Sequence, residues 1–153
     1  MPEDRKPRLL GINHVALEVG DIDAALEFYG RFFEFELRGR GDGHAFIDMG
    51  DQFLALAEVA EPHRDAERHF GLVVDDREGL RARLEAEGVE IVTEKRLDFL
   101  DPWGNRIEIV PYESIQFLKA RAVLEHLGRG GMRKTIGAKE ELARKGIVPP
   151  ADA

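Results

Sequence analysis

The sequence predicts an α+β fold in which paired βαβββ modules form a cupped mixed sheet. A strand-like stretch beginning at His14, HVALEV, has a counterpart beginning at His69, HFGLVV, and each is followed by an aspartate and a helix-like segment. After each helix come three short strand-like segments, separated by turns that contain glycine and aspartate. Such a repeat places equivalent residues of the two modules at symmetry-related positions.

The first module is expected over residues 10–60. Apolar and β-branched residues alternate over 11–19, which predicts a half-buried strand, and Asp21 can cap the helix that follows. That helix is expected over 22–33, because its apolar residues recur at spacings of three and four. Three strands are expected after it, at 34–38, 44–49 and 52–58.

The second module is expected over residues 68–111, after a polar connection at 61–67. It repeats the order of the first module, with a strand at 69–74, a cap at Asp75 or Asp76, a helix at 77–87 closed by Gly88, and strands at 89–93, 97–100 and 106–110. The turn DPWGN precedes the last strand. Residues 112–153 are expected to form a C-terminal helical extension, with helices at 115–127 and 138–146.

Composition and charge exclude several classes of partner. The 30 acidic and 22 basic residues give a formal net charge of -8, so long-range electrostatics disfavour nucleic acid and anionic membrane surfaces. The chain contains no cysteine, which excludes disulfides, thiolate nucleophiles and sulfur-ligated metal sites. No stretch has the pattern of a signal peptide or a membrane span, so a cytoplasmic location is expected.

His14 and His69 begin equivalent strands, which can point both imidazoles into one concavity. Glu108 lies between two isoleucines in RIEIV, where an unpaired buried carboxylate would be costly. A single strand histidine is more often an ordinary core or surface residue, but two at the same register, together with Glu108, favour a metal site. Two imidazoles and one carboxylate leave coordination positions open, as a catalytic ion requires, and they accept Mn, Fe, Co, Ni or Zn.

Aligning LAL in the first module with IEI in the second places Ala55 opposite Glu108, so the fourth symmetric position has no ligand. Strand parity puts Phe53 on the side of Ala55, and it puts His44 on the same side as Phe46. If that side is concave, His44 can act as a general base, and the two phenylalanines can form the apolar wall of a substrate pocket. The simpler interpretations, a solvated turn histidine and ordinary core phenylalanines, stay open.

Three stretches carry a resemblance to a known family: INHVALEVGDIDAALEFYGRFFEFEL, HFGLVVDD and DPWGNRIEIV. Together they resemble the vicinal oxygen chelate superfamily, which includes glyoxalase I, extradiol dioxygenases, fosfomycin-resistance thiol transferases and bleomycin-binding proteins. The resemblance implies the glyoxalase/bleomycin resistance/dihydroxybiphenyl dioxygenase fold around one divalent ion, commonly in a homodimer. Carried over by position, the metal ligands are His14, His69 and Glu108.

The chain departs from individual members of this family at several positions. Glyoxalase I relatives typically use a fourth ligand where this chain has Ala55. Fosfomycin-type relatives have a hydroxyl residue where this chain has Ala16 and a serine-rich potassium loop where it has TEKRLD, which argues against fosfomycin as the substrate. Many relatives have an aromatic residue where Asp98 precedes FLDP, so Asp98 is added to the predicted substrate pocket.

The resemblance implies a metal-dependent enzyme that acts on a small substrate with two adjacent oxygen atoms. Lyase, isomerase, dioxygenase and thiol transferase reactions all remain open. The alternative is a non-catalytic resistance protein of the bleomycin-binding type, which would hold a drug or metabolite in the cup without turnover. Such relatives generally lack the complete ligand set, so the set found here favours the enzyme. The basic loop at 128–135 can either fold over the cup toward an anionic substrate or simply connect two helices.

Overall fold

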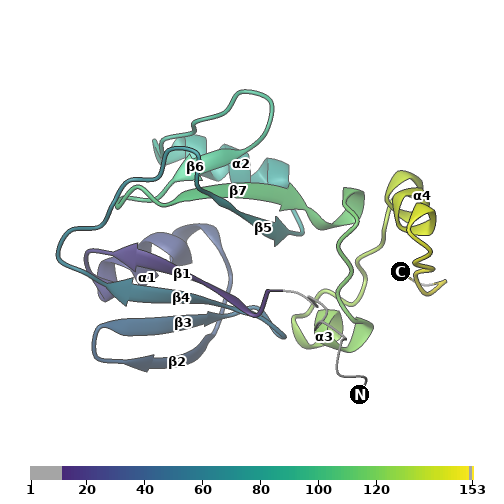
Figure 1. The fold of residues 1–153 in the computed structure, drawn as a ribbon, viewed down its shortest axis with the longest axis horizontal. Helices are drawn as coiled ribbons and strands as arrows, with labels where there is room; N and C mark the ends of the chain where they lie inside the picture. The colour runs from purple at the N-terminus through teal and green to yellow at the C-terminus, as the bar shows by residue number, and fades with distance from the viewer. Residues whose placement is uncertain (1–11, 152) are drawn as a thin grey trace, which may run out of the picture.

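The computed structural model describes residues 12–151 and residue 153. It contains two mixed sheets, one from each repeat, with the strand orders β1-β4-β3-β2 and β5-β7-β6 (Figure 1). The strands are β1 (His14–Val19), β2 (Leu37–Gly41), β3 (His44–Asp48), β4 (Phe53–Glu58), β5 (Phe70–Val74), β6 (Asp98–Leu100) and β7 (Arg106–Pro111). The predicted α+β class is confirmed.

The two sheets share the same register. In the first sheet β1 runs parallel to β4, and antiparallel β3 pairs Phe46 with Ala55. In the second sheet β5 runs parallel to β7, and antiparallel β6 pairs Asp98 with Glu108. On the other side of each central strand, Ala16 pairs with Ala55 and Gly71 pairs with Glu108. Ala16 and Gly71 each lie two residues after the histidine of their repeat. Ala55 and Glu108 therefore occupy equivalent positions, as the alignment of the repeat predicted.

Both repeat helices begin at a predicted aspartate. The Asp21 carboxylate accepts a hydrogen bond from the backbone N–H three residues on (2.7 Å) and starts α1 (Ile22–Phe32). The Asp76 carboxylate does the same (2.9 Å) at the start of α2 (Arg77–Ala86). These bonds satisfy backbone donors that have no partner inside the helix. The strand-to-helix turn therefore has the same form in both repeats.

One hydrophobic core joins the two modules, because α1, α2 and the strand residues that face them belong to a single cluster. A buried polar cluster crosses the same boundary. The Tyr29 hydroxyl on α1 donates to the Asp101 carboxylate (2.8 Å), while the Asn105 amide donates to Asp101 (2.8 Å) and to the Glu18 carbonyl (2.7 Å). Burial raises the pKa of Asp101 and that of Tyr29. The turn DPWGN is thus a structural link between the modules.

Two expected strands differ in the structure. β2 begins three residues later than predicted, and its pairing with β3 is irregular near its start. The strand expected at 89–93 is reduced to one bridge, between Ile91 and Phe99. The backbone N–H of Asp98 donates to the Thr93 hydroxyl (2.9 Å), so a side chain replaces the ladder bond that would continue the strand.

Beyond β7 the chain forms the C-terminal extension, which lies beside the two sheets (Figure 1). It contains a 3-10 turn, η1 (Tyr112–Ser114), and two helices, α3 (Arg121–His126) and α4 (Ile136–Arg144). Arg129, in the basic loop between them, forms ion pairs with Asp75 and Glu34 and so joins the extension to both modules. In the part of the chain that the structure describes, no helix is long and apolar enough to cross a membrane.

The helix predicted over 115–127 was wrong before residue 121. The ammonium group of Lys134 donates to the backbone carbonyls of Tyr112 and Ile115, and the Thr135 N–H donates to the carbonyl of Glu113 (2.9 Å). The Ile115 carbonyl, which a helix over 115–127 would use, is thus bound by a residue far along the chain instead of by an N–H group one helical turn ahead. A tertiary contact therefore overrides the helical spacing of the sequence.

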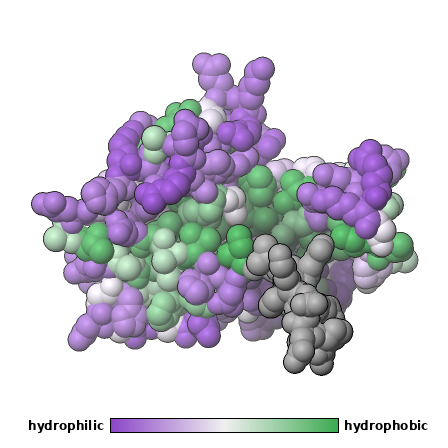
Figure 2. All heavy atoms as spheres, viewed as in Figure 1, coloured by the Kyte–Doolittle hydropathy of each residue, from purple (hydrophilic) through white to green (hydrophobic). Residues whose placement is uncertain are grey.

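Both repeat helices lie behind their sheets in the view of Figure 1. Seen from that side, a band of apolar side chains crosses the middle of the molecule, with hydrophilic side chains above it (Figure 2). Phe46 and Phe53, on the first sheet, are half-buried. The sheet face away from the helices is the one that carries the predicted site residues.

Candidate metal centre

His69 and Glu108 lie next to each other, just before β5 and in the middle of β7, with His69 Nε2 3.4 Å from a carboxylate oxygen. The other ring nitrogen, Nδ1, is 2.8 Å from the backbone carbonyl of Glu67, and it carries the proton because a carbonyl can only accept. In the neutral imidazole, Nε2 is therefore the nitrogen with the lone pair. A histidine that binds a metal ion usually has its second nitrogen held in this way.

Asp98 and Arg106 form a buried ion pair beside these two residues. The Asp98 side chain is fully buried, and Nε and Nη2 of Arg106 each lie 2.9 Å from one of its oxygens. The Thr93 hydroxyl donates to the other oxygen (3.3 Å). Asp98 pairs with Glu108 across the two strands, so it lies next to that predicted ligand. In this chain, however, its carboxylate faces Arg106 and not an open pocket.

His14, the third predicted ligand, begins β1 and stacks on Phe53, with ring centroids 4.7 Å apart and 9° between the planes. Its Nδ1 lies 2.9 Å from the amide oxygen of Asn13, so Nε2 again carries the lone pair. The guanidinium of Arg38 lies 4.4 Å from the Phe53 ring centroid. His14 thus rests on an aromatic ring in an exposed position.

The predicted pocket residues of the first module share one side of the sheet. Phe46 meets Phe53 edge to face, with centroids 5.5 Å apart, and the His44 ring lies 5.2 Å from Phe46. Ala55, which pairs with Phe46 and lies two residues after Phe53, is 9% exposed. His44 is exposed, and its Nδ1 donates to the Asp42 carbonyl (3.0 Å), which leaves Nε2 as the basic nitrogen. The role of His44 as a general base stays a prediction.

One chain brings together two of the three predicted ligands. β1 and β5 point in opposite directions in Figure 1, and each histidine lies at or just before the start of its strand. His14 and His69 are therefore carried to opposite ends. Within residues 12–151 and 153, no group of three or more His, Asp or Glu side chains could hold a metal ion. The three-ligand set stays a prediction that a single chain does not complete.

The residues that do meet fit a divalent cation. An imidazole nitrogen and a carboxylate oxygen face each other at 3.4 Å, and the ions from Mn to Zn accept both kinds of ligand. A cation is already drawn to this carboxylate, because the Arg96 guanidinium lies 3.6 Å from Glu108. The chemistry of these two donors thus agrees with the predicted metal, and the third predicted ligand, His14, is not among them.

Sequence reasoning missed two arginines beside these residues, Arg38 and Arg96. Arg96 lies two residues before Asp98, as His44 lies two before Phe46, so the parity argument that found His44 could also have found Arg96. Arg38 lies on the irregular part of β2, where parity fails. Arg96 was therefore within reach of the sequence, and Arg38 was not.

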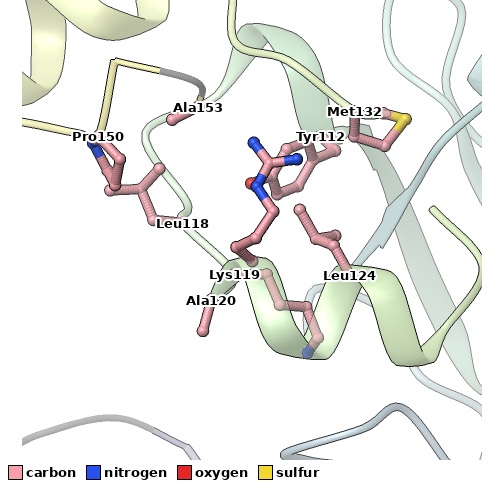
Figure 3. A pocket seen from close by; sticks show the side chains of 9 residues that line it. Tyr112, Leu118, Lys119, Ala120, Leu124, Met132, Pro150 and Ala153 are labelled. Atoms are coloured by element: carbon pink, nitrogen blue, oxygen red, sulfur yellow. The ribbon is translucent and has the colours of Figure 1, made fainter. Parts of the chain in front are cut away.

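Two pockets lie near these elements. One pocket, of about 180 Å³, is lined in part by Asn13, Arg38 and Phe53, the ring on which His14 stacks. The other, of about 220 Å³, lies in the extension between α3 and the segment after β7 (Figure 3). Its walls include Tyr112 and Leu124, and none of the predicted site residues lines it. The larger pocket is therefore separate from the candidate metal centre.

Comparison with known proteins gives a family match over both repeats. A sequence profile of the Glyoxalase/Bleomycin resistance protein/Dioxygenase superfamily matches residues 11–109. The match includes His14, His69 and Glu108, and it ends before the extension.

Individual relatives are enzymes of low sequence identity. Glutathione transferase FosA of Serratia marcescens is 27% identical over 113 residues, which cover 66% of this chain and 80% of the relative. Metallothiol transferase FosB of Bacillus licheniformis is 24% identical over 116 residues, or 67% of this chain and 75% of the relative. A solved lactoylglutathione lyase from Agrobacterium tumefaciens has a TM-score of 0.54 at 25% identity and covers 70% of this chain and 96% of its own.

Proposed function

The chain belongs to the glyoxalase/bleomycin resistance protein/dioxygenase superfamily, and we propose that it is a metal-dependent enzyme acting on a small substrate with two adjacent oxygen atoms. The observation that carries the proposal is the approach of His69 Nε2 to Glu108 at 3.4 Å, with Nδ1 held by a backbone carbonyl. Proteins similar to this chain include two transferases and a lyase, which supports catalysis over simple sequestration. The reaction is left open among lyase, isomerase, dioxygenase and thiol transferase chemistry.

A second copy of the chain completes the site in this proposal. His14 lies apart from the other two ligands, and β1 and β5 are both edge strands of their sheets. An edge strand has backbone groups that a partner can use, and a two-fold dimer makes each contact twice. In such a homodimer, His14 of the partner subunit would join His69 and Glu108, and the dimer would hold two identical sites.

The proposed roles follow from the chemistry of each side chain. The bound ion would supply Lewis-acid stabilisation of the negative charge that develops on the substrate oxygens. Phe46, Phe53 and Ala55 would bind the carbon skeleton of the substrate and exclude water. His44, whose Nε2 carries a lone pair, would accept a proton as general base.

Elemental analysis of the purified protein tests the metal ligands. We expect about one divalent ion per chain in the wild type and its loss from His69→Ala and Glu108→Gln, because each change removes one ligand. His63→Ala, at an exposed histidine of the connection, is the control and should keep the metal. Full metal content in Glu108→Gln would contradict the ligand set. A metal-free wild type that still binds aromatic compounds would support the sequestering protein instead.

Mixing two inactive variants tests whether the site is shared between subunits. His14→Ala and Glu108→Gln are unfolded together and refolded, so that mixed dimers form. Each mixed dimer has one site with both changes and one site with none, so metal content should recover to about a quarter of the wild-type value if subunits exchange at random. No recovery, in dimers whose mass is confirmed by light scattering, would place all three ligands in one subunit or exclude the set.

A further inference from the structure

Arg96 lies in the loop before β6, and its guanidinium approaches two carboxylates of the second module. Nη1 is 3.6 Å from Glu108 and Nη2 is 3.9 Å from Asp98, so both contacts are longer than a hydrogen bond. The Arg96 side chain is 54% exposed. It is therefore held loosely beside a predicted metal ligand.

Asp98 does not depend on Arg96. Its carboxylate is fully buried, Arg106 binds it at 2.9 Å, and Thr93 donates to it at 3.3 Å. Glu108 has a looser arrangement, because its carboxylate meets His69 at 3.4 Å and Arg96 at 3.6 Å. The interaction that matters for the position of Arg96 is thus the one with Glu108.

A divalent ion at Glu108 would compete with Arg96 for the same carboxylate. Both are cations, and two positive charges at this range repel each other. A guanidinium released from Glu108 would lie beside an ion that has open coordination positions. Its planar set of N–H donors matches the paired oxygens of a carboxylate or phosphate.

We propose that metal binding releases Arg96 from Glu108 and that the released guanidinium binds an oxyanion group of the substrate. The inference rests on the proposed function and deepens it, because it names the substrate class. That class is a small molecule with a carboxylate or phosphate close to its two chelating oxygens. Arg96 is then a specificity-determining residue. The equivalent position in the first module holds His44, which has no charge to offer an anion when neutral.

Calorimetric titration with Mn²⁺ alone tests the first step. Wild type, Arg96→Ala and Arg96→Lys are compared with Arg40→Ala, whose 46% exposed side chain pairs with Asp23 on α1. We expect Arg96→Ala to bind Mn²⁺ about threefold more tightly, since Glu108 loses a competing cation. Arg96→Lys, which keeps the charge, and Arg40→Ala should bind Mn²⁺ like the wild type.

Titration of the Mn²⁺-loaded proteins with inorganic phosphate tests the second step. Phosphate should bind Arg96→Ala about tenfold more weakly than wild type, and Arg96→Lys more weakly as well, because lysine lacks the planar set of donors. Arg40→Ala should match the wild type. Unchanged phosphate affinity in Arg96→Ala would overturn the oxyanion role, and unchanged Mn²⁺ affinity would overturn the competition. A wild type that binds no metal would overturn the proposed function and this inference with it.

Discussion

The two modules have the same backbone register and different chemistry on the same face. At three equivalent positions the first module carries Phe46, Phe53 and Ala55, and the second carries Asp98, Arg106 and Glu108. The first set forms an aromatic surface on which His14 stacks, and the second joins two carboxylates, Asp98 and Glu108, in a network of ion pairs. Backbone pairing determines where side chains lie but not what they are. A duplicated fold can therefore divide binding and metal chemistry between its halves.

Both modules have a histidine whose Nδ1 is hydrogen-bonded to an oxygen of a nearby residue. Nδ1 of His14 bonds a side-chain oxygen, and Nδ1 of His69 bonds a backbone carbonyl. Both imidazoles thus present Nε2. The carboxylate, by contrast, is present in the second module alone, because Ala55 occupies its place in the first. The comparison predicts one metal ion for each pair of modules, and substitutions at matched positions of the two modules can test it.

The largest effect is expected from the buried ion pair of the second module. Arg106→Ala leaves the fully buried Asp98 carboxylate without its main partner, so we expect the free energy of unfolding to fall by about 3–5 kcal/mol. Phe53→Ala, at the equivalent position of the first module, removes a half-buried ring and should cost about 1–2 kcal/mol. Urea denaturation measures both values. Equal losses would show that the two faces contribute alike to stability.

A second change makes the modules more alike. Ala55→Glu puts a carboxylate at the place equivalent to Glu108, and since Ala55 is 9% exposed we expect the metal-free variant to lose about 1–3 kcal/mol of stability. Zn²⁺ should restore most of this loss if the new carboxylate becomes a fourth ligand.

Ala55→Gln is the matched control, because its side chain has the same size and no charge. Thermal unfolding with and without Zn²⁺ compares the two variants. A Zn²⁺-induced rise in Tm that is the same for both would mean that position 55 does not face the metal.

A third effect, spread over a range of pH, concerns the segments that come after the last strands of the two modules. β7 leads into the extension, where burial lowers the pKa of Lys134 to about 8. In the unfolded chain its pKa is about 10.4, so between these values the unfolded state binds more protons and stability rises with pH, by at most about 1.4 kcal/mol per pH unit. Below about pH 8 the Lys134 side chain is protonated in both the folded and the unfolded state, so this rise of stability with pH is absent.

The difference in Tm between the wild type and Lys134→Met, followed from about pH 7 to about pH 10, measures this contribution. The wild type should gain on the variant above about pH 8. The first module offers no matched lysine, because β4 leads into the connection, which contains none. The control is therefore Lys145→Met, which removes a lysine at an exposed position of the extension. A flat difference for Lys134→Met would contradict the burial argument.

Local patterns in the sequence were sufficient for much of the fold and for part of the site. Asp21 begins α1 as predicted, and the alternation along β3 and β4 puts Phe46 and Phe53 on one side. The approach of His69 to Glu108 follows from the pairing of two neighbouring strands. Each of these predictions relates residues that lie within one element or one pair of strands.

Predictions that ignored distant parts of the chain were wrong or incomplete. The helix over 115–120 is absent, and Lys134 binds the Ile115 carbonyl that its first turn would use. The strand at 89–93 is nearly absent because the Thr93 hydroxyl binds the backbone of Asp98. Neither competitor can be recognised from helical or strand spacing.

From its spacing alone the chain specifies two equivalent strands, each led by a histidine, and one acidic residue in the later repeat. The pairing of β5 with β7 brings His69 to that acid, and the packing of the repeats settled that His14 lies apart from it. Related strands that run in opposite directions carry their first residues apart, and no pattern along a chain records the direction in which its two halves meet.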